Sequence, residues 1–187
     1  MKKESIPPEP TQSFRLISWG DSMDNVVVDH GAGDLVDDSG VGNTWHYHQE
    51  IELTLITRGK GTRYVGDDVA GFDGPELVLL GKNLPHHWSA PSSSGYCIQF
   101  LFEPSSPLSV IHESNEIKQL IKKANKGLLF SKRCTEDVQL MMEQCKQATS
   151  LERLAVLLKI LHRLSNARVK TISSCVPQGV AATKSAA

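Results

Sequence analysis

Between Ser13 and Phe102 the chain repeats short apolar or alternating segments separated by turn-forming residues. The segments read SFRLISW, NVVVDH, IELTLIT, TRYVG, ELVLL and YCIQFLF, and between them stand GAGD, DDSGVGN, RGKG, GDD, FDGP, GKNLP and APSSSG. Such segments are typical of strands, and turns at these intervals favour antiparallel pairing. We therefore expect an antiparallel sandwich or small barrel over residues 13–105.

After the stretch EPSSPLS the apolar residues change from strand spacing to helical spacing. In ESNEIKQLIKKANKG, the residues Ile117, Leu120 and Ile121 predict a helix, and Gly127 is expected to end it. In TEDVQLMMEQCKQA, Thr135 is the expected N-cap of a second helix.

The stretch TSLERLAVLLKILHRLSNA predicts a third helix, which Thr149 and Glu152 begin with a capping-box pattern. A leucine stripe runs along it at a 3-4-3 spacing: Leu151, Leu154, Leu158 and Leu161. Further apolar residues widen that surface: Leu157, Ile160 and Leu164. A helix this apolar needs contact on two sides, so we expect the stripe to form a homodimer interface; the alternative is that both sides pack within one chain. The helices make up an expected helical subdomain over residues 113–167.

The two ends of the chain lack the apolar pattern of the middle. Residues 1–12 are polar and contain Pro7, Pro8 and Pro10, which predicts a flexible arm. Residues 168–187 are small and polar, which predicts a linker or tail. No stretch approaches the roughly 18 apolar residues that a membrane span requires, and no secretory signal is recognised.

Length, charge and cysteines narrow the class of protein. A chain of 187 residues suits one domain of ordinary size. Its net charge of −1 gives no whole-chain electrostatic footprint for nucleic acid or an anionic membrane. The cysteines are widely spaced and form no CxxC pair, which favours reduced or buried thiols in a cytoplasmic protein over a disulfide framework. They are Cys97, Cys134, Cys145 and Cys175.

The stretch WHYHQEIELTLITRGKG, which begins at Trp45, concentrates imidazoles and carboxylates. Residues two apart on a strand share a face, so His46 and His48 are expected to project together. The same alternation adds both Glu50 and Glu52 to that face and does not choose between them. Two imidazoles and one carboxylate suit a divalent transition metal such as Fe, Mn, Ni or Zn, with a position left for water or substrate.

A second histidine pair, in GKNLPHHW, follows the apolar segment Leu77–Leu80. A neighbouring antiparallel strand would bring His86 or His87 against the first pair. The alternative is that one or both are turn histidines packed on Trp88.

The spacing of these residues resembles a known family motif. From Gly40 the chain reads glycine, five residues, His46, one residue, His48, three residues, Glu52, six residues and Gly59. This resembles the first motif of the cupin superfamily at every fixed position. The resemblance implies that Glu52 is the carboxylate ligand.

The second cupin motif is matched more loosely. Its Gly-Asp start falls at Pro75-Glu76, its proline at Gly81, and its second glycine at Asn83, a residue type that tolerates the left-handed conformation. Its histidine falls on His86. The resemblance implies a cupin-like small β-barrel (double-stranded β-helix) that holds a four-ligand metal set: His46, His48, Glu52 and His86.

Longer stretches resemble a narrower family. WHYHQEIELTLITRGKGTRYVGDD and ELVLLGKNLPHHW are similar to the N-terminal sensor domain of AraC-type transcriptional regulators, and KKANKGLLFS and LERLAVLLKILHRLS are similar to the helices that follow the barrel there. The resemblance covers about residues 13–168. It implies a domain that binds a small-molecule effector and forms a homodimer. DNA would be bound only through a C-terminal domain with two helix-turn-helix units, expected just past residue 187.

In such a sensor, aromatic and polar groups around the barrel mouth would orient the effector. The candidates are Trp45, Tyr47, Glu50, Arg63, Tyr64, Trp88 and Gln99. The alternative is a core role for the tryptophans and tyrosines and a solvated strand position for Arg63. The second function considered is a stand-alone cupin-type metal enzyme, an oxygenase or isomerase, in which an open metal position activates water or dioxygen. No catalytic residue is assigned, and a sensor can also use the histidines on its effector directly, without metal.

Overall fold

The strands of the molecule form one hydrogen-bonded network. The computed structural model describes residues 1–7 and 12–175, and twelve strands pair within them. All pairs are antiparallel except β1 with β5. In chain order the strands are β1 (Lys2–Lys3), β2 (Arg15–Trp19), β3 (Asn25–Gly31), β4 (Asp34–Ser39), β5 (His46–Tyr47), β6 (Ile51–Val65), β7 (Asp68–Asp73), β8 (Glu76–Leu80), β9 (His86–Ser89), β10 (Ser93–Phe100), β11 (Leu128–Phe130) and β12 (Val169–Thr171).

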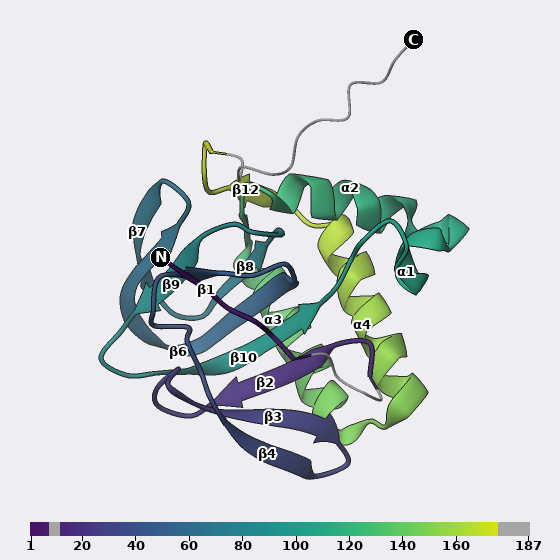
Figure 1. Cartoon of the computed structure of the whole chain (residues 1–187), viewed down its shortest axis with the longest axis horizontal. Coiled ribbons are helices and arrows are strands. Elements are labelled where there is room, and N and C mark those ends of the chain that lie inside the picture. Colours follow the sequence, from purple (N-terminus) through teal and green to yellow (C-terminus); the bar gives the residue numbers. More distant parts are fainter. Residues whose placement is uncertain (8–11, 176–187) are drawn as a thin grey trace.

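The order of the strands defines an open, curved arrangement (Figure 1). The main path runs β1-β5-β9-β6-β10-β2-β3-β4, and β7, β8, β11 and β12 attach beside it. Its end strands, β1 and β4, do not pair with each other, so among the described residues the sheet is not closed. The expected mainly β fold with helices is confirmed.

Strand β6 is the centre of this network. The sequence predicts two strands here with a turn at RGKG, but the fifteen residues of β6 form one continuous strand. The part up to Gly59 pairs with β8 and β10, and the part from Lys60 pairs with β7 and β9. Gly59 has a φ of 133°, and a Cβ there would lie 2.8 Å from the Cβ of Ser93. The expected turn is wrong because this glycine lets the strand change partners without ending.

Side chains of the central strands alternate between two faces of the sheet. On β6, Ile51, Leu53 and Leu55 lie in the core that faces the helices, whereas Glu52 and Thr54 lie on the opposite face. Neighbouring strands add to the helix-facing side Leu16, Leu77, Leu79, Ile98 and Phe100. They add to the opposite side Ile17, Trp19, Val78, Leu80 and Cys97.

Helices cover the first of these faces (Figure 1). They are α1 (Pro107–Val110), α2 (Asn115–Ala124), α3 (Lys132–Gln147) and α4 (Ser150–Ser165), with a short 3-10 turn, η1, at His112–Ser114. Apolar side chains of α2, α3 and α4 join the helix-facing strand residues in one buried cluster. The sheet and the helices therefore share a core.

Two of the three predicted helix boundaries are confirmed. Thr149 caps α4 and forms a capping box with Glu152, and Gly127 follows the end of α2 with a φ of 67°. The third boundary is wrong, because α3 starts one turn earlier than Thr135. Ser131, the residue after β11, is the N-cap, and Thr135 is buried inside the helix, where its hydroxyl donates to the Ser131 carbonyl at 3.1 Å.

Helix α4 buries a wider face than the leucine stripe. Leu161 is fully buried in the shared core, so the prediction that it lies at a dimer interface is wrong. Leu151 is 75% exposed, and Leu154 and Leu158 are partly buried against the core. The residues that widened the apolar surface are also buried: Leu157, Ile160 and Leu164.

A buried ion pair ties α4 to the sheet. Nη1 of Arg153 lies 3.1 Å from Oδ1 of Asp29 on β3, and both side chains are 1% exposed. Arg153 also donates to the Asp29 carbonyl at 2.5 Å, to the Cys145 carbonyl at 3.0 Å and to Oε1 of Gln12 at 2.9 Å. All of its nitrogens are therefore satisfied inside the protein.

The N-terminal segment is tied to the sheet rather than forming a free arm. Residues Lys2–Lys3 pair with β5, and the backbone N–H of Glu4 donates to the Tyr47 carbonyl at 2.9 Å. The rest of the predicted arm, residues 8–11, lies outside the described residues.

The first part of the predicted tail also belongs to the fold. Strand β12 pairs with β11, and Asp67 accepts hydrogen bonds from Ser173 and Ser174. Residues 176–187 of the tail lie outside the described residues. The stretch DDS, expected in a turn, instead ends β4, an edge strand whose six residues are all exposed.

Two further expectations can be compared with the described part of the chain. No helix there is long and apolar enough to cross a membrane. The four cysteines are free thiols, three of them buried, with Cys175 exposed.

Candidate metal centre

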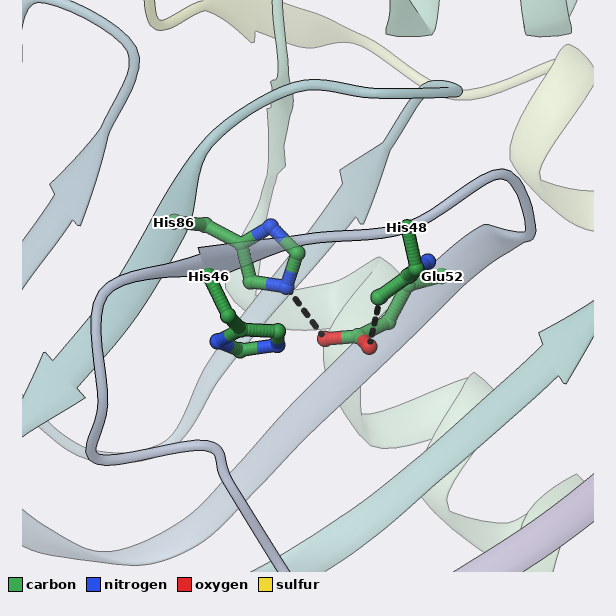
Figure 2. Close-up of side chains that lie close together, drawn as sticks. All are labelled: His46, His48, Glu52 and His86. Atoms are coloured by element: carbon green, nitrogen blue, oxygen red, sulfur yellow. Dashed lines mark hydrogen bonds and ion pairs between the residues drawn. The ribbon is translucent and has the colours of Figure 1, made fainter. Parts of the chain in front are cut away.

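The four side chains predicted as metal ligands converge on the sheet face opposite the helices (Figure 2). His46 comes from β5, Glu52 from β6, His86 from β9, and His48 from the loop between β5 and β6. All four are buried, and one potential ligand atom from each lies within 4.8 Å of the others. The complete predicted set is therefore brought together by three strands and a loop.

Strand pairing and one turn explain this convergence. His46 on β5 pairs directly with His86 on β9. Because β5 has only two residues and the chain bends before β6 begins, His48 and Glu52 do not share one continuous strand, as the alternation assumed. Asn83 has a φ of 58°, as its residue type allows, and donates its N–H to the His48 carbonyl at 2.7 Å. This turn holds the loop that carries His48.

A backbone carbonyl fixes each of the three imidazoles. Because a carbonyl only accepts, each Nδ1 must donate, and the neutral ring then presents the lone pair of Nε2. Metal-ligating histidines are held in this way. The Nδ1 atoms and the residues whose carbonyls they contact are His46 with Thr44 at 2.6 Å, His86 with Leu84 at 2.7 Å, and His48 with Glu50 at 3.1 Å.

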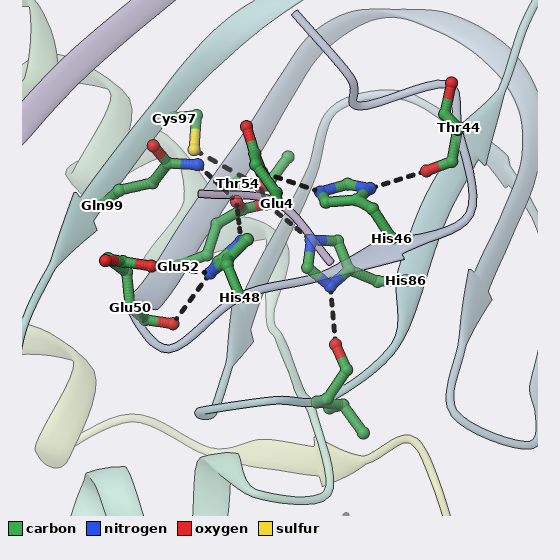
Figure 3. Close-up of polar contacts among 11 residues, drawn as sticks. Glu4, Thr44, His46, His48, Glu50, Glu52, Thr54, His86, Cys97 and Gln99 are labelled. Carbon is green, nitrogen blue, oxygen red and sulfur yellow. Dashed lines mark hydrogen bonds and ion pairs between the residues drawn. The ribbon is translucent and has the colours of Figure 1, made fainter. Parts of the chain in front are cut away.

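The carboxylate of Glu52 is held from several directions (Figure 3). Its Oε1 accepts from the Thr54 hydroxyl at 2.6 Å, and its Oε2 accepts from Nε2 of Gln99 at 3.0 Å. Nε2 of His48 lies 3.0 Å from Oε2, and Nε2 of His86 lies 3.5 Å from Oε1. Partners of this kind orient a ligand before the metal arrives.

Burial and neighbouring charges set the ionisation of the centre. Burial alone would raise the pKa of Glu52, but His86 and the hydrogen bond from His48 hold it well below its usual range. Burial would lower the pKa of His48, but the hydrogen bond and charge of Glu52 outweigh burial and raise it. Burial and the nearby His86 lower the pKa of His46 to about 4. At neutral pH Glu52 is therefore ionised and His46 is neutral, as metal ligation requires.

The residues present fit a divalent transition metal. Nε2 of His86 is buried and has no hydrogen-bond partner among the described residues, and an unsatisfied buried nitrogen is costly. A cation at the centre of the cluster would satisfy it. Three imidazole nitrogens and one carboxylate oxygen are donors that suit Fe, Mn, Ni or Zn.

A cavity of about 480 Å³ adjoins the centre, and His46 and Glu52 form part of its wall. The apolar part of the wall includes Ile17, Trp19, Met23, Val26, Trp88 and Cys97. Its polar part includes Glu4, Arg15, Asp38, Thr54 and Gln99. Apolar walls with a few placed polar groups are typical of small-molecule sites.

Two of the seven predicted effector-binding residues, Trp88 and Gln99, line this cavity. The other five do not line this cavity, and their role in binding an effector stays a prediction. Trp45 and Tyr64 contact the ring of His87, with centroids 5.4 Å and 4.2 Å away. The five residues are Trp45, Tyr47, Glu50, Arg63 and Tyr64.

Arg63 and Glu50 do not lie at the cavity, where the sequence predicted them. Arg63 is 4% exposed and donates to Glu76 at 2.5 Å and to Asp68 at 3.2 Å, so it is neither a cavity group nor a solvated strand residue. The Glu50 carboxylate lies 3.5 Å from Nδ1 of His48, behind the ring as seen from the metal position. It is the carbonyl of Glu50 that helps to orient His48.

Sequence reasoning missed two groups of the centre, Thr54 and Glu4. Thr54 lies two residues after Glu52 on the same strand face, so the alternation that placed Glu52 also contained the signal for Thr54. Glu4 lies 3.5 Å from Nε2 of His46, yet it comes from the polar N-terminal segment. Nothing in the local pattern around Glu4 marks it.

Comparison with known proteins assigns no family. No protein-family model matches the chain, and no curated protein matches it. What the centre and its cavity do is therefore argued from their geometry.

Proposed function

We propose that the protein is a small-molecule sensor in which a metal centre forms one wall of the binding cavity. His46, His48, Glu52 and His86 would hold Fe, Mn, Ni or Zn inside a cupin-like barrel. The observation that carries this proposal is that His46 and Glu52 belong to the ligand cluster and also line the cavity. A molecule in the cavity therefore meets the metal ligands directly.

The cavity wall indicates the kind of molecule that fits. Trp19, Trp88 and Ile17 offer aromatic and apolar surface, while Arg15 and Gln99 offer polar groups near the centre. A bound divalent metal supplies a Lewis-acidic position for an oxygen or nitrogen donor. We therefore expect a small molecule with a ring or short apolar body and one donor group, such as a carboxylate or hydroxyl.

The sensor role includes dimerisation and signalling, as in AraC-type regulators. Leu151 on α4 is exposed, and Leu154 and Leu158, which follow it in the stripe, are partly buried. This part of the stripe would pack on a second copy of the chain. The helices and the sheet share a core, which supports coupling between cavity and dimer. The ligand would act by binding one of two arrangements more tightly. DNA would be contacted only by a C-terminal helix-turn-helix domain following this sequence.

Metal analysis of tag-free protein tests the centre. The protein is offered Fe, Mn, Ni and Zn in turn, and about one equivalent of one of them is expected to remain bound. His86→Ala should lose the metal. His87→Ala is the matched control, because His87 is the next residue but stacks on Tyr64 outside the cluster. A metal content near zero in the unaltered protein overturns the metal centre.

Ligand binding and oligomeric state test the sensor. Metal-loaded protein is screened by thermal shift against sugars, hydroxy acids and aromatic acids, and its mass is followed by light scattering. We expect a dimer and at least one stabilising compound. A monomer without any ligand-dependent change overturns the sensor role.

A second function, a stand-alone cupin-type oxygenase or isomerase, is favoured by the carboxylate of Glu4 at the cavity wall. Its Oε2 is 3.5 Å from Nε2 of His46, where it could accept a proton from a bound substrate. Dioxygen consumption or repeated conversion of a bound compound would support the enzyme. Reversible binding without turnover would support the sensor.

A further inference from the structure

Glu4 lies at the metal centre although it follows the N-terminal strand β1 (Figure 3). Its Oε2 is 3.5 Å from Nε2 of His46, and within the described residues this buried oxygen has no hydrogen-bond partner. The charged groups that act on it most strongly are those of the cluster, His48, Glu52 and His86. Glu4 therefore lies beside the cluster, next to His46, although its carboxylate is not within 4.8 Å of all four potential ligand atoms.

The contact between Glu4 and His46 joins two hydrogen-bond acceptors. Nδ1 of His46 donates to the Thr44 carbonyl, so Nε2 of the neutral ring carries a lone pair. An ionised carboxylate oxygen also only accepts. Two such acceptors repel unless a cation lies between them, either a metal ion or, because burial raises the pKa of Glu4, a proton. Two donors about 2.1 Å from one metal, at tetrahedral or octahedral angles, lie roughly 3.0–3.4 Å apart, close to the separation in this pair.

The backbone holds Glu4 in this position. Strand β1 runs parallel to β5, with Lys2 paired to His46. The N–H of Lys2 donates to the Trp45 carbonyl at 3.0 Å, and the N–H of Glu4 donates to the Tyr47 carbonyl at 2.9 Å. These bonds anchor the segment to the strand that carries a metal ligand, so the carboxylate is placed by the main chain.

We propose that Glu4 is a fifth ligand of the metal centre and that metal binding thereby fixes the N-terminal segment across the cavity. The inference rests on the metal binding proposed above. The segment is one wall of the cavity, which it lines with Lys2, Lys3, Glu4, Ser5 and Pro7. A small molecule with a carboxylate would compete with Glu4 for the metal and would thereby release the segment.

Glu50 provides a matched control for Glu4. Its carboxylate is also 3.5 Å from a histidine nitrogen, but this is Nδ1 of His48, on the side of the ring away from the metal position. Glu50 does not line the cavity. Glu4→Gln and Glu50→Gln therefore remove the same charge at the same distance from an imidazole, and only the first removes a ligand.

The experiment measures two quantities on the full, tag-free chain. Zinc affinity is determined by competition with a chromophoric chelator, and amide hydrogen exchange at Lys2 and Glu4 is followed by NMR with and without zinc. We expect Glu4→Gln to bind zinc roughly tenfold or more weakly, and Glu50→Gln to bind it as the unaltered protein does. Zinc should slow exchange at both amides in the unaltered protein and in Glu50→Gln, but not in Glu4→Gln.

The outcomes separate this inference from the proposed function. If the unaltered protein binds no zinc, nickel, manganese or iron, both fail. If it binds a metal, but Glu4→Gln binds that metal equally well and shows the same protection, the metal centre stands and the fifth ligand is overturned. Equal weakening by Glu4→Gln and Glu50→Gln would mean that charge alone is responsible, which also overturns the ligand role.

Discussion

The same strands present two very different faces. Toward the helices, β6 contributes Ile51, Leu53 and Leu55 to a core that is almost wholly apolar. Toward the cavity it contributes Glu52 and Thr54, both buried and polar. On the first face polar groups are few, and the Arg153–Asp29 pair is satisfied by its own contacts together with Gln12, Gly31 and the Cys145 carbonyl.

Because of this difference in polarity, the two faces contribute differently to the stability of the protein. Burial of apolar side chains on the helix side stabilises the fold, because each removes surface from water. Burial of carboxylate and imidazole groups on the cavity side costs stability unless they pair with one another or with a ligand. The cavity face therefore lowers the stability of the metal-free protein and makes it responsive to what it binds.

The largest expected effect on stability comes from removing the buried ion pair on the helix-facing side of the sheet. Arg153→Ala should lower the free energy of unfolding by about 3–5 kcal/mol, because it leaves the Asp29 carboxylate buried without its partner. Urea unfolding measures this. Arg163→Ala, which removes a half-exposed partner of Asp137, should cost only about 0–1 kcal/mol. Similar losses for the two variants would mean that Asp29 is not held as described.

Neighbouring residues on β6 separate the two faces directly. Leu53→Ala should cost about 2–5 kcal/mol of stability, because it opens a cavity in the helix-facing core, and should leave zinc affinity unchanged. Thr54→Val should reduce zinc affinity by about 10–100-fold, because it removes the hydroxyl that orients Glu52. Urea unfolding and chelator competition on both variants check this. A loss of affinity in Leu53→Ala would show that the faces are not independent.

The pH dependence of metal binding is expected to come from residues on the cavity face alone. The raised pKa of His48 means that a proton must leave before metal binds, so affinity should fall by about tenfold per pH unit below that pKa. The pKa of His46, lowered to about 4, and that of Glu52, held well below its usual range, add no further proton above pH 5. Nickel affinity measured between pH 5 and 8 checks the slope. Burial also raises the pKa of Glu4, so a bound Glu4 would add a second proton to this slope. An affinity that does not change between pH 5 and 8 would contradict the assignment to His48.

The smallest expected effect on stability lies on the outer side of α4. Leu151→Lys should convert the proposed dimer to a monomer while changing the free energy of unfolding of one chain by less than about 0.5 kcal/mol. Light scattering and urea unfolding at low concentration measure the two. Leu161→Lys, at a fully buried position, should unfold the chain instead.

How much of the structure can be predicted from the sequence depends on the kind of sequence pattern. Alternation and helical spacing predicted most strands and helices, because burial on one face leaves a local pattern. Gly59 was misread, since a glycine that bends a strand looks like one that ends it. The stripe at Leu161 was misread because spacing does not show how wide the buried face of a helix is.

Alternation predicted that His46 and His48 project together, whereas Glu52 and His86 were assigned only by the resemblance to the cupin motifs. Local alternation alone left Glu50 and Glu52 equivalent, and only the bend before β6 distinguishes them. Glu4 is beyond local patterns altogether. It reaches the centre through a parallel pairing of β1 with β5, which no spacing in the sequence encodes.

Strand β6 has a consequence for how the molecule melts. It hydrogen-bonds to β7, β8, β9 and β10, and it carries the core leucines on one side and Glu52 on the other. If β6 unfolds, the helix-facing core loses its leucines and the candidate metal centre loses Glu52 at the same time. We therefore expect the two regions to lose their order together. Heating should therefore produce a single cooperative transition, in which near-ultraviolet signals from Trp88 at the cavity and far-ultraviolet signals from the helices disappear together.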